Sequence, residues 1–251
     1  HGSDLFQLGA DGRGDAERAQ EAGKGCDRGD GVGYSRKVHA EYEEFVGMPQ
    51  PLSTVVPEAG MIIGQTGDRA VSRHPELATM FAEAISTWSS VEFELLKFYL
   101  NMFGGAESLV ATAYLALTTS SAKLNVILAV GEKRMVPKHY KVLQAILSIV
   151  KSREKARNKL AHRVWGYSIE LPDALLLADP AHLLALPATA KDVFVYKAAD
   201  FKSIISDNEE LASWIIDLGI MHQYRGDQQA DRLYEELSEQ PDIALKLSIQ
   251  K

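Results

Sequence analysis

Residues 75–102 read PELATMFAEAISTWSSVEFELLKFYLNM, and this stretch decides the fold. Its apolar residues recur at intervals of three and four, which is the period of one face of an α-helix. They are Leu77, Phe81, Ala84, Ile85, Trp88, Val91, Leu95, Phe98, Tyr99 and Met102. Gly104 and Gly105 follow, and glycines at this place end helices. The pattern predicts a single helix of roughly 40 Å.

Further helices are predicted downstream of this one. A second helical stretch covers about 107–132, with a polar interruption at 118–121, and a third starts at Pro137 and continues to about 164. A fourth is expected over about 201–224, capped by Asp200 and kinked near Asp207 and Asn208. A short acidic helix is expected over about 228–239. Long helices joined by short connections favour antiparallel neighbours in a bundle.

The pattern changes between the third and fourth long helices. Residues 164–171, 175–177 and 193–197 are short runs rich in β-branched, aromatic and aliphatic residues, and prolines lie among them. Such runs are typical of strands. The sequence therefore predicts a mainly α protein, an antiparallel helical bundle with a small β-hairpin or meander inserted before the last long helix.

Four segments are expected along the chain. Residues 1–34 are rich in Gly, Asp and Arg and are predicted to form a flexible leader, in which His1-Gly2-Ser3 is typical of a cloning remnant. Residues 35–73 form an N-terminal extension with a short helix near 35–46. The helical domain covers 74–224, including the β insertion at 164–197. Residues 225–251 form an acidic C-terminal segment, which we expect to lie against basic residues and to regulate the protein.

Composition excludes several classes of protein. The 251 residues are 46% hydrophobic and 24% charged, which are values of an ordinary globular protein. The single cysteine, Cys26, excludes a disulfide within the chain and a cysteine-based zinc site. No apolar run is long enough to span a bilayer. We therefore expect a cytoplasmic protein that does not contact membranes, and the residues indicate no cofactor.

Charge is distributed unevenly. The chain has a net charge of −7, but residues 133–163 contain ten basic residues and one acid, Glu154, and carry +9. The rest of the chain carries −16. A local basic field of this kind can bind the phosphates of RNA. A solvated helix face is the alternative interpretation, and the charge pattern does not decide between the two.

A motif lies near the end of the third helix, where residues 153–167 read REKARNKLAHRVWGY. Arg157 is followed by Asn158, and His162 lies five residues after the arginine. This arrangement resembles the signature of the HEPN superfamily, the helical ribonuclease domains of toxins, defence systems and CRISPR effectors. The resemblance covers about 74–224 and is specific only at the motif. It implies a bundle of four or five helices, an endoribonuclease activity and a homodimer that brings two motifs together.

The chemistry of these side chains agrees with that reading. A histidine such as His162 can take a proton from a ribose 2′-hydroxyl or give one to the leaving oxygen. Arg157 can stabilise the charge that grows on the phosphorus. Asn158 and His162 are four residues apart and share a helix face, so Asn158 could hold the imidazole or a phosphate oxygen. No metal is required, and one histidine cannot easily make both proton transfers, which also favours a homodimer.

Two other Arg-x4-His spacings show that spacing alone is weak. Arg69 and His74 straddle an expected helix start, and Pro137 interrupts the segment between Arg134 and His139. Within the motif, His162 could be simply a histidine at a helix C-terminus, and Arg157 a surface charge. Val164 occupies the position of a tyrosine that some toxins of the family carry, which argues against modification at that position.

Supporting residues are also predicted. Glu92 interrupts the apolar stripe of the first helix and is either a boundary residue or one that orients Arg157 or His162 from the facing helix. RNA contacts are expected from the basic residues around the motif, namely Lys151, Arg153, Lys155, Lys159 and Arg163.

Three functions fit these observations. The first is a metal-independent endoribonuclease, a toxin or phage-defence effector with RNA as substrate and an antitoxin or regulatory protein as a partner. The second is a HEPN-fold module that binds RNA or protein without catalysis. The third is a structural helical-bundle dimer.

Overall fold

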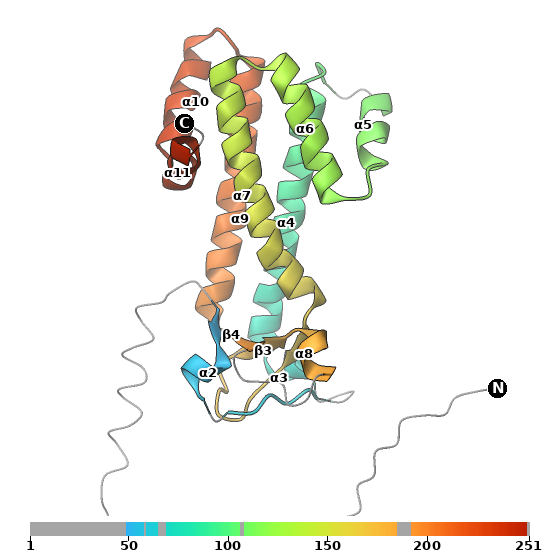
Figure 1. Cartoon of the computed structure of the whole chain (residues 1–251), viewed down its shortest axis with the longest axis vertical. Helices are drawn as coiled ribbons and strands as arrows, with labels where there is room; N and C mark the ends of the chain where they lie inside the picture. The colour runs from blue at the N-terminus through green and yellow to red at the C-terminus, as the bar shows by residue number, and fades with distance from the viewer. Residues whose placement is uncertain (1–48, 58, 65–68, 106–107, 185–191, 250–251) are drawn as a thin grey trace, which may run out of the picture. The chain divides into compact units, whose positions relative to one another are not determined.

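The computed structural model describes residues 49–57, 59–64, 69–105, 108–184 and 192–249 (Figure 1). The expected leader and the expected helix near 35–46 lie outside these residues. The described chain is mainly helical with one small antiparallel sheet, as predicted. Among the described helices, none has both the length and the apolar character needed to span a bilayer.

Three long helices form the centre of the fold and lie side by side (Figure 1): α4 (Pro75–Asn101), α7 (Pro137–His162) and α9 (Ala198–Gln223). The apolar stripe predicted for α4 is its buried face, with Trp88, Val91 and Leu95 in the main core. Gly104 and Gly105 follow the helix at φ of 91° and 131°, a conformation that favours glycine. The first helix is therefore confirmed together with its end.

The second predicted helix is in fact two helices, α5 (Ser108–Leu115) and α6 (Ser120–Arg134). The break, at residues 116–119, overlaps the polar interruption predicted at 118–121. The Thr119 side chain accepts a hydrogen bond from the backbone N–H of Ala122 and so caps α6. Gly131 lets α6 approach α7 closely, since a Cβ there would lie 2.4 Å from the Leu143 side chain.

The predicted β insertion is an antiparallel meander of β2 (Val164–Gly166), β3 (Leu175–Ala178) and β4 (Val193–Tyr196). The sequence did not indicate β1 (Gln50–Pro51), which pairs with the free edge of β4. Three short helices accompany the sheet: α2 (Leu52–Val55), α3 (Ala70–Arg73) and α8 (Pro180–Leu184). The sheet lies at the end of the bundle where α7 finishes and α9 begins (Figure 1). A second apolar cluster joins the two through Leu160, Leu177 and Phe201.

The fourth long helix differs from its prediction at two points. Asp200 lies in the first turn of α9 rather than before it, and its carboxylate accepts a hydrogen bond from the backbone N–H of Lys197 at 2.8 Å. α9 is one continuous helix through Asp207 and Asn208, and the kink expected there stays a prediction. The Asn208 amide instead donates to Ala84 O and Thr87 Oγ1 of α4, at 3.2 and 3.1 Å.

The acidic C-terminal segment is part of the bundle. The acidic helix expected over 228–239 is α10 (Gln228–Glu239), and α11 (Pro241–Ile249) follows it. Ala230, Leu237 and Ile243 are buried in the same core as α4, α7 and α9. The segment does contact basic residues of α7, since Lys138 pairs with Asp231. Its buried side chains nevertheless show that these helices complete the core.

Two buried histidines join the C-terminal helices to the bundle. His139 on α7 stacks on Tyr234 of α10 with ring centroids 5.8 Å apart, and His222 lies nearby on α9. Burial lowers the pKa of both histidines, and nearby cations lower it further. For His139 the cation is Lys138, and Asp231 acts in the opposite direction. For His222 the cations are Arg225 and Arg134.

Because His139 and His222 are buried with lowered pKa values, we expect the protein to lose stability in mild acid. Histidines of the unfolded chain accept protons at about pH 6.5, before the folded ones do, so the free energy of unfolding should fall as pH drops below that value. The raised pKa values of Asp200, Asp207 and Asp217 favour the folded state only at lower pH, near the carboxylate range.

The measurement is the urea midpoint between pH 7.5 and 5.5. A variant with His139→Gln and His222→Gln should show a smaller fall than the parent, whereas His162→Gln, at an exposed position, should keep the parental fall. An unchanged slope in the double variant would contradict the assignment.

Candidate functional site

The central contact of the candidate site joins α7 to α4. Arg157 Nη2 lies 3.0 Å from Glu92 Oε1, and the Arg157 guanidinium lies over the Trp88 ring, 5.8 Å from its centroid. Arg157 Nε is buried and has no hydrogen-bond partner among the described residues. Leaving such a donor unpaired costs about 1–3 kcal/mol. Of the alternatives left open for Glu92, the contact with Arg157 is present, but it satisfies the guanidinium only in part.

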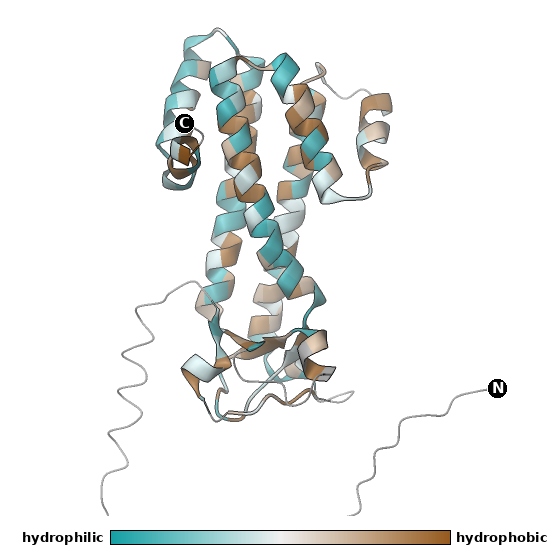
Figure 2. Ribbon diagram, viewed as in Figure 1, coloured by the Kyte–Doolittle hydropathy of each residue, from teal (hydrophilic) through white to brown (hydrophobic). Residues whose placement is uncertain are grey.

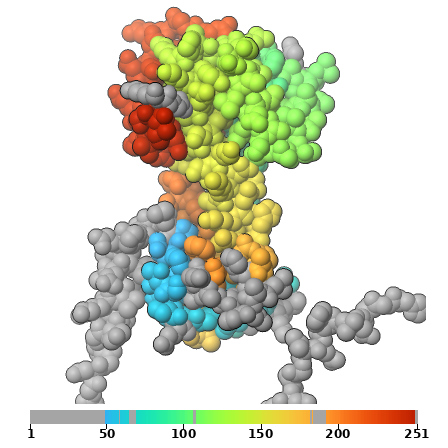
Figure 3. Space-filling model, viewed as in Figure 1, coloured from blue at the N-terminus to red at the C-terminus, as the bar shows by residue number. Residues whose placement is uncertain are grey.

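Asn158 and His162 follow on the next turns of α7. Asn158 is half-buried, and His162, the last residue of the helix, is exposed. Lys151, Lys155 and Lys159 are also exposed, and spacings of four place these three on one side of the helix; together we call them the basic stripe. The half of α7 nearest the sheet is hydrophilic (Figure 2) and reaches the surface of the face shown in Figure 3.

Arg153 is placed differently from the basic stripe. Its side chain is only 14% exposed and lies within 3.1–3.7 Å of three carboxylates, those of Asp207, Glu210 and Asp242. It also lies 5.3 Å from the centroid of the Trp214 ring. These contacts neutralise its charge and attach α7 to α9 and α11, so we omit Arg153 from the proposed RNA contacts.

Arg163 also has partners within the protein. Its guanidinium lies 4.9 Å from the centroid of the Phe194 ring, and the Lys159 ammonium lies 5.6 Å from the same ring. Arg163 is half-buried, whereas Lys159 is exposed. The predicted RNA contacts therefore separate into exposed lysines and arginines that pack against protein.

A cleft of about 420 Å³ opens beside Arg157 and Asn158. Its walls come from α4, α5, α6 and α7. The apolar lining includes Trp88, Phe93, Leu96, Tyr114 and Leu115, and the charged lining consists of Glu92, Lys123, Glu154 and Arg157. His162 does not line it. The cleft adds Lys123, Tyr114 and Glu154 to the candidate site; of these, only Glu154 carried a signal in the sequence, as the one acid of the basic segment and four residues from Asn158.

The cleft also contains the buried hydroxyl group of Tyr114. Burial, with Glu92 and Tyr99 as further causes, raises the pKa of Tyr114 to about 12, so its hydroxyl remains protonated at neutral pH. The Lys123 ammonium lies 5.6 Å from the centroid of the same ring. Tyr114 can therefore donate a hydrogen bond at neutral pH.

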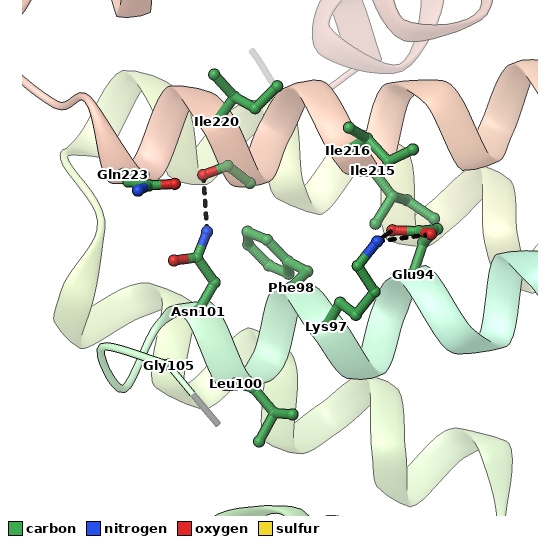
Figure 4. Close-up of a pocket in the computed structure, with 11 residues that line it drawn as sticks. Glu94, Lys97, Phe98, Leu100, Asn101, Gly105, Ile215, Ile216, Ile220 and Gln223 are labelled. Atoms are coloured by element: carbon green, nitrogen blue, oxygen red, sulfur yellow. Dashed lines mark hydrogen bonds and ion pairs between the residues drawn. The ribbon is translucent and has the colours of Figure 1, made fainter. Parts of the chain in front are cut away.

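A second cavity, of about 390 Å³, lies between α4 and α9 (Figure 4). Its lining is mainly apolar, with Phe98, Ile215 and Ile220 among the residues drawn. Its polar groups are paired within the protein, since Asn101 donates to Gly219 O at 3.0 Å and Lys97 pairs with Glu94 at 2.8 Å. Within this cavity the charged side chains and Asn101 are thus engaged with other protein groups, while the amide of Gln223 lies at an exposed position of the lining.

Comparison with known proteins gives no family for the chain, because no family model, curated protein or solved structure matches it. Within the part of the chain that the structure describes, no three His, Cys, Asp or Glu side chains are grouped so that they could hold a metal ion. The arguments about function consequently depend on the geometry around α7.

Proposed function

We propose that the protein is a metal-independent endoribonuclease of the HEPN type, acting as a toxin or phage-defence effector. The observation that supports this most is the arrangement at the end of α7. There, an arginine tethered by Glu92 precedes an exposed histidine, and the basic stripe runs alongside. The helix supplies a group that stabilises anionic charge, a group that transfers protons and a surface for phosphates.

Each side chain has a role in the proposed reaction. His162 is the acid–base group for the ribose 2′-hydroxyl and the leaving 5′-oxygen. Arg157 exchanges its single contact with Glu92 for the phosphate and binds it through two N–H groups. Asn158, one turn before His162, contacts the bound RNA. The lysines of the basic stripe hold the flanking phosphates.

We propose further that the site is shared between two copies of the chain. His162 is exposed at a helix end, and no histidine lines the cleft beside Arg157 among the described residues. A homodimer that brings two α7 ends together would supply one histidine for each proton transfer. A monomer in solution that retains full activity would contradict this arrangement.

The reaction type predicts the products. Since the nucleophile is the 2′-hydroxyl of the RNA itself, cleavage should leave a 2′,3′-cyclic phosphate and a 5′-hydroxyl and should continue in the presence of a chelator. The experiment incubates the purified protein with RNA and EDTA and analyses the ends of the fragments. An otherwise identical RNA with a 2′-O-methyl group at the cut site is the control. Its cleavage, or cleavage of single-stranded DNA, would rule out this mechanism.

The alternative is a module of the same fold that binds RNA without cutting it. The contact between Glu92 and Arg157 favours this candidate, because an arginine engaged by a carboxylate can have a purely structural role. Salt-dependent RNA binding without fragments would support this second function.

A further inference from the structure

The cleft beside Arg157 has a lining that points to a particular ligand. Two of its four charged side chains, Arg157 and Glu92, pair with each other, and the other two, Lys123 and Glu154, have opposite charges. The formal charge of the lining is therefore zero. An uncharged ligand suits such a cleft better than a phosphate does, whereas the basic stripe suits phosphates.

The cleft also has unpaired hydrogen-bonding groups on one wall. Glu154 and Asn158 lie four residues apart on α7, and neither side chain has a hydrogen-bond partner among the described residues. Glu154 offers a carboxylate, which only accepts hydrogen bonds, and Asn158 offers an amide that can donate. The α7 wall therefore presents the two carboxylate oxygens of Glu154 as acceptors and, one turn further along the helix, the amide of Asn158 as a donor.

The aromatic side chains of the cleft come from α4 and α5. Phe93 and Leu115 are 58% and 61% exposed at the cleft, while Trp88 and Tyr114 are buried behind it. A volume of about 420 Å³ lies within the range of small-molecule sites. A flat heterocycle with polar edges fits these features, because its faces pack on apolar side chains and its edge bonds to the polar wall.

We infer that the cleft binds a guanine base, unstacked from single-stranded RNA, with Glu154 and Asn158 reading its Watson–Crick edge. This inference rests on the proposed function, because the cleft adjoins the segment that carries His162. Guanine presents two adjacent N–H donors, N1–H and the N2 amino group, which one carboxylate can accept together, and its O6 accepts from Asn158. Adenine, cytosine and uracil do not present two adjacent donors on this edge, so Glu154 makes the site selective.

This arrangement also assigns a place to the neighbouring nucleotide. Asn158 lines the cleft, and His162 is one turn further along α7 at the surface. A base in the cleft therefore has its sugar and phosphate next to the end of α7. The cleaved bond is consequently expected beside a guanosine.

The first measurement tests the cleft without requiring cleavage. Titration of the full chain with GMP, AMP, CMP and UMP, followed by calorimetry, should show GMP binding most tightly. Glu154→Gln should weaken GMP binding by roughly 10- to 100-fold, since it removes a charged acceptor. Glu83→Gln is the matched control, because Glu83 is exposed on α4 outside the cleft, and it should leave binding unchanged. Phe93→Ala should weaken all four nucleotides alike.

The second measurement maps the cut sites in an RNA of mixed sequence. The inference is supported if the parent protein cuts beside guanosine and the Glu154→Gln variant loses this preference. Selective, Glu154-dependent GMP binding without any cleavage supports the base site and contradicts the nuclease. Cleavage with no base preference, unchanged in Glu154→Gln, supports the nuclease and overturns the base site. Equal affinities for the four nucleotides, or no binding of any, also overturn it.

Discussion

Replacing His162 with alanine should lower the rate of RNA cleavage by about 100- to 10,000-fold, which is the usual contribution of a general acid or base. The substitution removes the one imidazole that α7 carries at its exposed end. The fold should remain intact, because an exposed side chain at a helix terminus contributes little to packing. The measurement compares initial rates under chelation with the thermal unfolding temperature of each variant.

His74→Ala is the matched control for this experiment. His74 also lies five residues after an arginine, Arg69, but the two residues flank the short helix α3, and the His74 side chain, at the N-cap position of α4, makes no capping hydrogen bond. The control should cleave RNA at the parental rate. Full activity in His162→Ala, or an equal loss in both variants, would contradict the assignment of His162.

The periodic parts of the fold could be predicted from the sequence. The stripe of α4 and the start of α7 at Pro137 follow from local chemistry, because helix period and proline placement are properties of neighbouring residues. The division of the second helix could also have been predicted, since Thr119 is a good N-cap residue within the polar interruption. In contrast, β1 is only two residues long, includes Pro51 and depends on pairing with distant β4.

The candidate site was only partly predictable for the same reason. Glu92 was singled out because it interrupts the apolar stripe, either as a boundary residue or as a partner of Arg157 or His162, and its contact with Arg157 is present. The surroundings of Arg153 could not be predicted, because its acidic partners are 54 to 89 residues away. The cleft likewise needs walls from four helices, and no local pattern shows which side chains of those helices will meet.

The C-terminal helices provide the second large effect. Ile243→Ala should lower the free energy of unfolding by about 2–5 kcal/mol, the usual cost of removing a large aliphatic side chain from a core. Ile243 is fully buried in the cluster that joins α11 to the bundle. That loss is a large part of the 5–15 kcal/mol that stabilises a typical domain, so deletion of both C-terminal helices should prevent stable folding.

Leu245→Ala, on the same helix, is the matched control. Leu245 is 60% exposed, so its truncation should change the free energy of unfolding by less than about 0.5 kcal/mol. Urea unfolding followed by circular dichroism measures both variants.

Two small and equal effects would show that α11 does not contribute to the core, and an acidic tail that regulates RNA access would again be the better description. A large effect at Ile243 alone would instead mean that regulation by this segment cannot be tested by deleting it. Charge substitutions at Asp231 and Asp242, which pair with Lys138 and Arg153 of α7, would then be the appropriate test.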